Sequence, residues 1–224
     1  METTLEERIA IVRERVASAA NGRDVTLVGV AKTKPAELVR RAVAAGLTVI
    51  GENYVQEFRD KSAAGAYDGA DVHIIGRLQT NKVKYVAGRV SLIQSVDSER
   101  LLALIAARAA ALGVTQDVLL EVNIGGEAAK SGIPPEAVPE LLAAASGLKG
   151  VRVRGLMAIP PEENSRAYFP KMYHLYIDNN AKKYDNVSMD FLSMGMSDDY
   201  EDAIKQGANM VRVGSFIFGP RNYT

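Results

Sequence analysis

Hydrophobic and polar residues alternate along this chain with two different periods. Short runs rich in valine, leucine and isoleucine recur between longer segments whose apolar residues have helical spacing, and this alternation predicts strands separated by helices. The runs predict eight strands, at residues 25–31, 47–50, 72–75, 90–95, 117–122, 151–159, 191–194 and 209–214. The spacing predicts helices between them, at residues 37–45, 55–64, 81–86, 98–112, 135–145, 166–182 and 199–206.

The segment before the first strand predicts one more amphipathic helix. Thr4 followed by Glu7 is the signature of a capping box, in which a hydroxyl and a carboxylate each accept a backbone N–H at the helix start. Asn21-Gly22 is a stop signal for this helix. The apolar positions of the segment share one helical face: Leu5, Ile9, Val12 and Val16.

The order of the elements indicates an α/β fold with a parallel sheet. Parallel neighbours need a crossover connection, and short apolar strands separated by helices supply it. Eight such units predict a closed (β/α)8 barrel, the TIM barrel, although 224 residues is fewer than the ~250 typical of that fold. No helix is predicted after the last strand, so we expect the N-terminal helix to pack in place of the last barrel helix. A doubly wound open sheet is the alternative. With no linker or shift in composition, we expect one domain over residues 1–224.

Composition narrows the classes of function. The chain is 47% hydrophobic and 24% charged with a net charge of +0, which is typical of a globular protein. A dedicated binder of nucleic acid or of an anionic membrane needs a basic face, which balanced charge disfavours. The absence of cysteine excludes disulfides and thiolate metal sites. The longest apolar window, 101–114, is shorter than the ~20 residues of a membrane span, and the charged N-terminus is unlike a signal peptide. We therefore expect a cytoplasmic protein.

Lys32 is the most informative candidate for chemistry. Sites in such barrels lie at the carboxyl ends of the strands, and Lys32 directly follows the apolar first strand. We expect its amine to be partly desolvated at the barrel mouth, with Lys34 nearby, and both effects lower the pKa of a lysine. A neutral amine can condense with an aldehyde. The alternative is a solvated lysine at a strand end, and Lys130, in a glycine-rich loop, is a weaker rival.

The end of the last strand predicts an anion site. Backbone amides of the Gly214-Ser215 turn can point at phosphate oxygens, and barrels of this type often hold phosphate after strands seven and eight. Ser197 lies where a helix is expected to begin, so it either joins this site or caps that helix. Arg212 alternates with two valines and points either into the barrel or outward. Its role is either a structural salt bridge or donation to the ring nitrogen of a cofactor.

Other chemistry has little support in the sequence. The chain has two histidines without ligand spacing, which predicts no metal site, and His73 fits a hydrogen-bonded core residue. Glycine-rich nucleotide-binding motifs and a GxSxG nucleophile motif are absent.

Five spaced motifs resemble the pyridoxal 5′-phosphate (PLP) homeostasis protein family. In chain order they are VAKTKP at 30–35, GENYVQE at 51–57, HIIGRLQTNK at 73–82, LSMGMSDD at 192–199 and VRVGS at 211–215, followed by IFG at 217–219. The resemblance runs from the N-terminal helix to the last strand. It implies a fold similar to the barrel domain of bacterial alanine racemase.

The resemblance also implies roles for individual residues. Lys32 would hold PLP as a Schiff base, and Arg212 would face the pyridine nitrogen. Asn53 would line the pocket, and Lys34 matches a second lysine of the family motif. The phosphate would be held by Ser197, Gly214 and Ser215.

Physical chemistry favours a carrier over an enzyme. PLP catalyses by acting as an electron sink, and a permanently charged arginine leaves the ring nitrogen unprotonated and weakens that sink. In the racemase family the second catalytic base comes from a separate β-domain, for which this chain has no residues left. We therefore expect a PLP carrier that serves vitamin B6 and amino-acid balance, with transient contacts to PLP-dependent apo-enzymes and a monomeric state. The alternatives are a slow PLP-dependent amino-acid racemase and a Schiff-base aldolase that uses Lys32 on a sugar phosphate.

Overall fold

The strands form a closed, entirely parallel barrel. The computed structural model describes residues 3–182 and 184–220. Each strand pairs with the next along the chain, and the last pairs in parallel with the first, with Val28 in register with Arg212. This closure confirms the predicted barrel and excludes the open sheet. The strands are β1 (Thr26–Val30), β2 (Val49–Glu52), β3 (Asp71–Ile74), β4 (Leu92–Val96), β5 (Gln116–Val122), β6 (Val151–Ala158), β7 (Val187–Ser193) and β8 (Met210–Val213).

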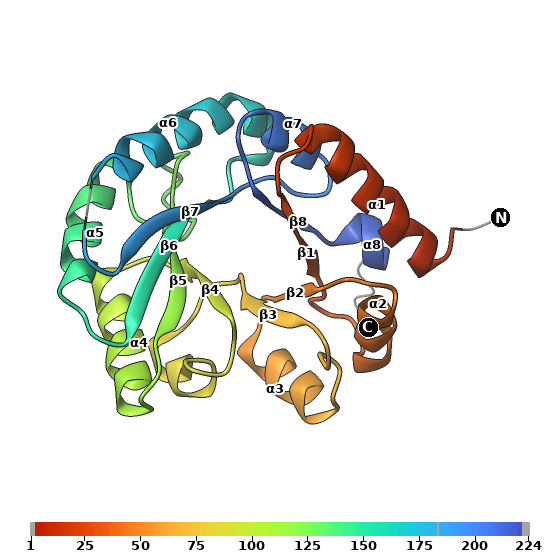
Figure 1. Ribbon diagram of the computed structural model, residues 1–224, viewed down its shortest axis with the longest axis horizontal. Helices are drawn as coiled ribbons and strands as arrows, with labels where there is room; N and C mark the ends of the chain where they lie inside the picture. Colours follow the sequence, from red (N-terminus) through yellow and green to blue (C-terminus); the bar gives the residue numbers. More distant parts are fainter. Residues whose placement is uncertain (1–2, 183, 221–224) are drawn as a thin grey trace.

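The helices surround the barrel, and the N-terminal helix closes their ring (Figure 1). They are α1 (Leu5–Ala20), α2 (Ala36–Ala44), α3 (Val55–Ala63), η1 (Thr80–Tyr85), α4 (Glu99–Ala111), η2 (Pro135–Ala137), α5 (Val138–Ser146), η3 (Glu162–Ala167), α6 (Phe169–Asn180), α7 (Tyr200–Lys205) and α8 (Ser215–Phe218), where η marks a 3₁₀ helix. α1 packs against α7, α8 and α2, which confirms that it takes the place of the last barrel helix. Its predicted capping box is present, with Thr4 N donating to Glu7 Oε2 at 2.8 Å and Glu7 N donating to Thr4 Oγ1 at 3.2 Å.

Four predicted elements differ from the structure. The helix expected at 166–182 is divided into η3 and α6, and the helix expected at 135–145 into η2 and α5, because Pro170 and Pro139 fit only the first turn of a helix. The helix expected at 81–86 is the 3₁₀ segment η1. β7 begins at Val187, four residues earlier than expected, because Ser188 and Asp190 interrupt the apolar pattern with side chains that form polar contacts. Within the described residues, no helix is long and apolar enough to cross a membrane.

The core has two parts, and their arrangement fixes the direction of Lys32. A large cluster fills the space between strands and helices, and a smaller one contains Val28, Val49, Leu92, Leu119, Met157 and Met210. The smaller cluster takes its residues from six strands, so it fills the barrel interior. Side chains alternate along a strand, which places Val28 and Val30 on the inward side of β1, and Lys32 lies in the turn just beyond them and lines the pocket at this end of the barrel. The same alternation directs Arg212 inward, two residues beyond Met210.

Candidate functional site

A pocket of about 180 Å³ opens at the carboxyl ends of β1, β7 and β8. Its lining includes Lys32, Lys34, Ser197, Arg212, Gly214 and Ser215. The structure therefore brings together five of the six site residues predicted from the sequence. Asn53, the sixth, follows β2 at the same end of the barrel but does not line this pocket.

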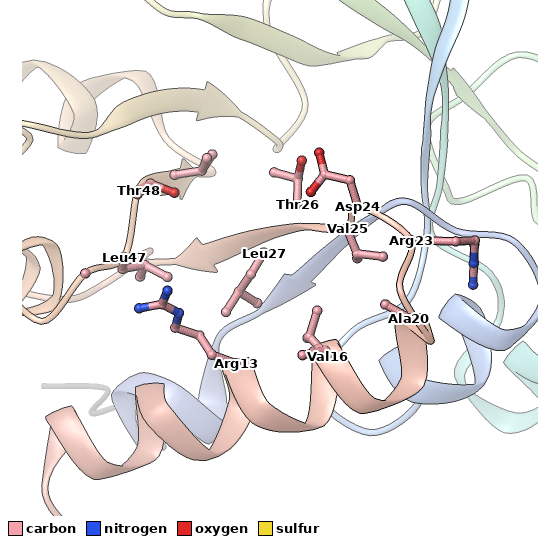
Figure 2. A pocket seen from close by; sticks show the side chains of 13 residues that line it. Arg13, Val16, Ala20, Arg23, Asp24, Val25, Thr26, Leu27, Leu47 and Thr48 are labelled. Atoms are coloured by element: carbon pink, nitrogen blue, oxygen red, sulfur yellow. The ribbon is translucent and has the colours of Figure 1, made fainter.

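A larger hollow at the opposite end of the barrel contains none of these candidates. It has a volume of about 470 Å³ and lies between α1 and the beginnings of β1 and β2 (Figure 2). Arg13 and Val16 extend toward it from α1, and Leu47 and Thr48 approach it from the segment before β2. Size alone therefore does not identify the site.

Lys32 and Lys34 line this pocket at the barrel mouth, which we call the mouth pocket, whereas Lys130 does not. Lys32 is half-buried. Lys34 Nζ donates to the carbonyl oxygens of Gly219 at 3.2 Å and Pro220 at 2.7 Å. Burial, with a smaller contribution from Arg8, lowers the pKa of Lys34. Lys130 pairs with Glu127 at 2.5 Å and does not line the pocket, so the geometry favours Lys32 over its rival.

Ser197 and Gly214 connect the loops after β7 and β8. Gly214 N donates to Ser197 Oγ at 3.3 Å. The N-terminal cap of α7 is Asp199, so the alternative in which Ser197 merely caps that helix is wrong. The Asp199 carboxylate accepts from Met196 N at 2.7 Å. Gly214 immediately precedes α8, where a helix start leaves amides without an intrahelical acceptor.

Arg212 is held by a chain of buried polar groups inside the barrel. Its side chain is 3% exposed and donates to Ser193 Oγ at 2.6 Å and to Ala158 O at 2.9 Å. Ser193 donates to Gln94 Oε1 at 2.7 Å, and Gln94 Nε2 lies 2.9 Å from His73 Nδ1. The arginine is therefore fixed by neutral groups, and these two bonds use two of its five N–H donors.

Burial sets the charge states along this chain of groups. Burial lowers the pKa of Arg212 to about 10, so the guanidinium stays charged at neutral pH. Burial also lowers the pKa of His73 to about 4, so this ring is neutral, which confirms a hydrogen-bonded core histidine. No group of three or more His, Asp or Glu side chains among the described residues could hold a metal ion.

Glu121 is a buried acid that the sequence reasoning missed. It lies on β5 and is 5% exposed. Burial raises its pKa to about 7, Asp97 adds to the rise, and Arg212, the hydroxyl of Ser131 and Arg77 oppose it. The available signal was a single glutamate within the apolar run VLLEV at 118–122.

A second missed group is the buried ion cluster formed by β2, α3 and the segment before β3. Lys61 Nζ contacts Glu52 Oε1 at 2.8 Å and Glu57 Oε2 at 3.0 Å. Tyr67 OH donates to Glu52 Oε1 at 3.0 Å. Lys61 is 6% exposed and Glu52 is 0% exposed. The available signal was the i,i+4 spacing of Glu57 and Lys61.

Asn53 has an unsatisfied acceptor. Its Oδ1 is buried and has no hydrogen-bond partner among the described residues. Gly76 packs directly against Asn53, since a Cβ at Gly76 would lie 2.5 Å from the Asn53 carbonyl oxygen. A glycine is therefore required where β3 ends next to this residue.

Comparison with known proteins agrees with this architecture. The model of the family "alanine racemase, N-terminal domain" matches residues 3–222. A protein of Aquifex aeolicus named pyridoxal phosphate homeostasis protein is 46% identical over 226 residues, covering 97% of this chain and 98% of the relative. The chain belongs to the pyridoxal phosphate homeostasis protein family. This confirms the resemblance found in the sequence.

Solved structures extend the comparison from sequence to fold. PipY of Synechococcus elongatus, solved with PLP bound, is 31% identical with a TM-score of 0.84, and the match covers 96% of this chain and 100% of PipY. Alanine racemase of Clostridium difficile is 15% identical with a TM-score of 0.74, and the match covers 95% of this chain and 56% of the racemase. The racemase shares the barrel fold with this member of the homeostasis family.

Proposed function

We propose that this protein holds PLP reversibly as a Schiff base on Lys32 and serves PLP (vitamin B6) homeostasis and amino-acid balance without robust catalysis. The observation that carries the proposal is the pocket at the barrel mouth. The amine of Lys32, the buried guanidinium of Arg212 and the loops after β7 and β8 meet there. The names of the relatives and the PLP bound to PipY support the same ligand.

The residues of the pocket fit the chemical groups of PLP. The Ser215 amide at the start of α8 and the Ser197 hydroxyl suit a phosphate dianion, and the Gly214 amide, which donates to Ser197 Oγ, would turn to the phosphate when it binds. Arg212 has donors left for a ring nitrogen. Asn53 does not line the pocket, so its buried Oδ1, which has no partner among the described residues, would accept a hydrogen bond from PLP only where the ligand reaches beyond the lining residues.

Lys32 carries the covalent step in this proposal. With PLP bound, the Lys32 amine would condense with the aldehyde of PLP, forming a C=N bond and releasing one water. Water or a competing amine reverses the bond, which allows transfer. When bound, PLP supplies the aldehyde and an electron-withdrawing ring.

The chemistry of Arg212 is the reason why the proposal includes no robust catalysis. A guanidinium donates and does not give up its proton near neutral pH, so it leaves a ring nitrogen unprotonated. The match to alanine racemase covers 56% of that enzyme, and the rest of the racemase lies outside the match. A slow racemase is the alternative.

The test of the proposal is a visible spectrum after addition of PLP, with and without a competing amine. We expect Schiff-base absorbance that the amine removes, and a borohydride-reduced adduct on Lys32 by peptide mass spectrometry. Lys32→Ala should lose the absorbance and keep the circular dichroism of the fold. Lys205→Ala, an exposed lysine on α7, should keep both. An adduct on another residue, or none, contradicts the proposal.

The same protein sample distinguishes the alternatives. Incubation with single enantiomers of alanine and serine should give negligible racemisation, and rapid turnover would favour the racemase. Trapping of a sugar phosphate in place of PLP would favour the aldolase. A monomeric state, a cytoplasmic location and transient contacts with PLP-dependent apo-enzymes stay predictions.

A further inference from the structure

The buried ion cluster contacts the backbone on both sides of Lys32. Lys61 Nζ donates to Ala31 O at 2.7 Å, and Glu57 Oε2 accepts from Thr33 N at 2.7 Å. These two groups belong to the peptide units immediately before and after Lys32. Both contacts come from one helix, α3, so a single rigid element holds the backbone of Lys32 from two directions.

Burying this cluster costs free energy of desolvation, so stability alone does not explain it. Lys61 and Glu52 are almost completely buried, and burial raises the pKa of Glu52. The second oxygen of Glu52 is buried and has no partner among the described residues. Replacing a buried ion pair by well-packed apolar residues is often neutral or stabilising. A role in positioning the backbone of Lys32 would explain why charged side chains are buried beside it.

The segment that the cluster holds is strained. Thr33 has a φ of 63°, the left-handed region, which a β-branched residue rarely adopts. Such a conformation persists only where the surroundings over-determine it. The hydrogen bond from Thr33 N to Glu57 acts on this residue directly, and the bond from Lys61 to Ala31 fixes the backbone two residues earlier.

We propose that Glu57, Lys61 and Glu52 are positioning residues that hold the strained backbone around Lys32 and direct its amine into the mouth pocket. Lys61 contacts the Ala31 carbonyl, Glu57 contacts the Thr33 amide, and Glu52 holds Lys61 between them. The inference rests on the proposed function, because direction matters only if Lys32 is the point of attachment. Misplacing a reacting group by about 1 Å can cost up to about 100-fold in rate.

Glu57 is the position to change, because its side chain is 27% exposed whereas those of Lys61 and Glu52 are buried. Glu57→Ala removes the acceptor for Thr33 N, and Glu57→Gln keeps a carbonyl oxygen in its place. Asp60→Ala is the matched control, since Asp60 lies exposed on the same helix and contacts Gln56. Thermal melts by circular dichroism establish that each variant is folded.

Each variant is titrated with PLP and, separately, with pyridoxine 5′-phosphate, which carries an alcohol where PLP has its aldehyde. For Glu57→Ala we expect the affinity for PLP as a Schiff base to fall about tenfold or more, because the amine of Lys32 no longer points at the aldehyde. We also expect part of the borohydride-trapped adduct to be found on residues other than Lys32. Glu57→Gln should lie within about threefold of wild type, because its carbonyl still accepts from Thr33 N. Asp60→Ala should match wild type, and the affinity for pyridoxine 5′-phosphate should stay unchanged throughout.

The two ligands separate positioning from a general structural role. Equal weakening of both ligands in Glu57→Ala would show a structural effect on the whole pocket and overturn the inference. Unchanged Schiff-base affinity and an adduct confined to Lys32 in Glu57→Ala would overturn it as well. An adduct absent from Lys32 in the wild-type protein would instead overturn the proposed function, and the positioning role with it.

Discussion

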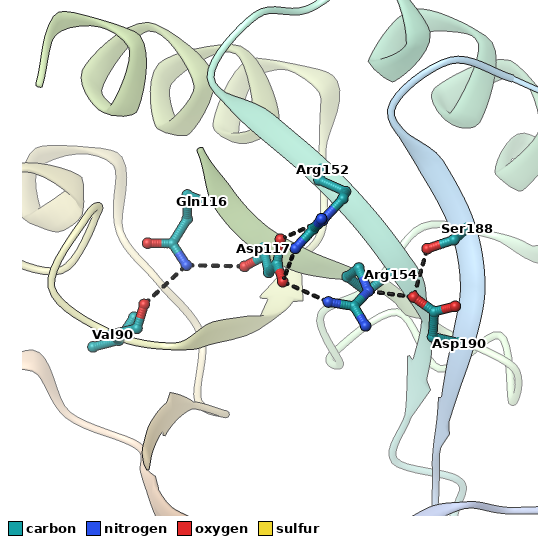
Figure 3. A network of polar contacts seen from close by, with 7 residues as sticks. All are labelled: Val90, Gln116, Asp117, Arg152, Arg154, Ser188 and Asp190. Carbon is teal, nitrogen blue, oxygen red and sulfur yellow. Dashed lines mark hydrogen bonds and ion pairs between the residues drawn. The ribbon is translucent and has the colours of Figure 1, made fainter. Parts of the chain in front are cut away.

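Both ends of the barrel carry ion pairs, and the pairs differ in how far water reaches them. At the amino-terminal end, Asp117 bridges Arg152 and Arg154 across β5 and β6, and Arg154 also pairs with Asp190 on β7 (Figure 3). The side chains of Arg152, Arg154 and Asp117 there are 51%, 25% and 18% exposed. At the carboxyl-terminal end, the Lys61 and Glu52 side chains are 7% and 0% exposed.

This difference in exposure separates a network that adds modest stability from a cluster that fixes geometry. Exposed ion pairs are solvated in both the folded and unfolded states, so each contributes roughly 0–1 kcal/mol. A buried charge has no water to replace a lost partner, so it holds its partners firmly and is costly to disturb. Lys61 and Glu52 beside Lys32 are of the second kind, whereas Glu57 is 27% exposed.

The largest expected effect is at Lys61. Lys61→Met leaves Glu52 buried without its cation, so the free energy of unfolding should fall by about 3–5 kcal/mol. Urea titration monitored by circular dichroism measures it. The double variant Lys61→Met/Glu52→Gln should regain part of the loss, because no unpaired buried charge remains. A loss as small as that of an exposed pair would remove the contrast between the two ends.

The next effect is a pH dependence from Glu121. Burial raises the pKa of Glu121 in the folded protein to about 7, so the folded state binds this proton more tightly than the unfolded state. The stability from Glu121 is fully present below the ordinary glutamate pKa and is lost as pH rises through about 7.

Glu121→Gln should remove that loss. Relative to the wild type, the variant should gain about 3 kcal/mol of unfolding free energy between about pH 4 and pH 8. Urea titrations at the two pH values measure the difference. The charged groups that act on Glu121 are Asp97, Arg212 and Arg77. Parallel pH profiles of variant and wild type would contradict the raised pKa.

A smaller effect is expected inside the barrel at Gln94. Gln94→Leu leaves the hydrogen of the Ser193 hydroxyl without its acceptor and removes the contact with His73 Nδ1, which should cost about 1–3 kcal/mol of unfolding free energy. Because Ser193 also accepts from Arg212, the affinity for pyridoxine 5′-phosphate should fall too. Gln94→Glu keeps an acceptor for Ser193 and should lose less affinity. Unchanged affinity in the Leu variant would show that Arg212 needs no support from this chain of groups.

The smallest effect is expected at the amino-terminal end. Asp117→Asn removes the charge that bridges Arg152 and Arg154 but keeps an acceptor oxygen at a place that water partly reaches, so it should cost about 1 kcal/mol, less than Lys61→Met. The loss should shrink further as salt is added, because exposed pairs are screened, whereas the loss in Lys61→Met should stay nearly constant. Equal salt sensitivity in the two variants would contradict this difference in solvent access between the two sets of ion pairs.

The sequence predicted the barrel well because periodicity is a local property. The order of eight strands, the capping box of α1 and the position of that helix were all correct. Errors arose where tertiary contacts override local pattern. Ser188 and Asp190 hid the start of β7 because they interrupt its apolar run, and only the fold gives them partners: Ser188 donates to Asp190, and Asp190 pairs with Arg154.

The sequence predicted one part of the candidate site, because the ends of strands are visible in the local pattern. The loops after β1, β7 and β8 were found from the strand-end rule, and their residues do meet in one pocket. Glu121, Gln94 and the Lys61 cluster were not found. A buried polar residue looks like any surface residue in a sequence, because its burial depends on which other segments cover it.

By itself, the sequence determined the alternation of strands and helices, the barrel that follows from it, and the family. These depend on side-chain polarity at fixed spacing along the chain. The tertiary structure alone decided which charges are buried, where Arg212 points and which helix holds the backbone of Lys32. Those features depend on contacts between residues far apart in sequence, such as Ala31 with Lys61 or Arg212 with Ala158, which only the closed barrel brings within hydrogen-bond distance.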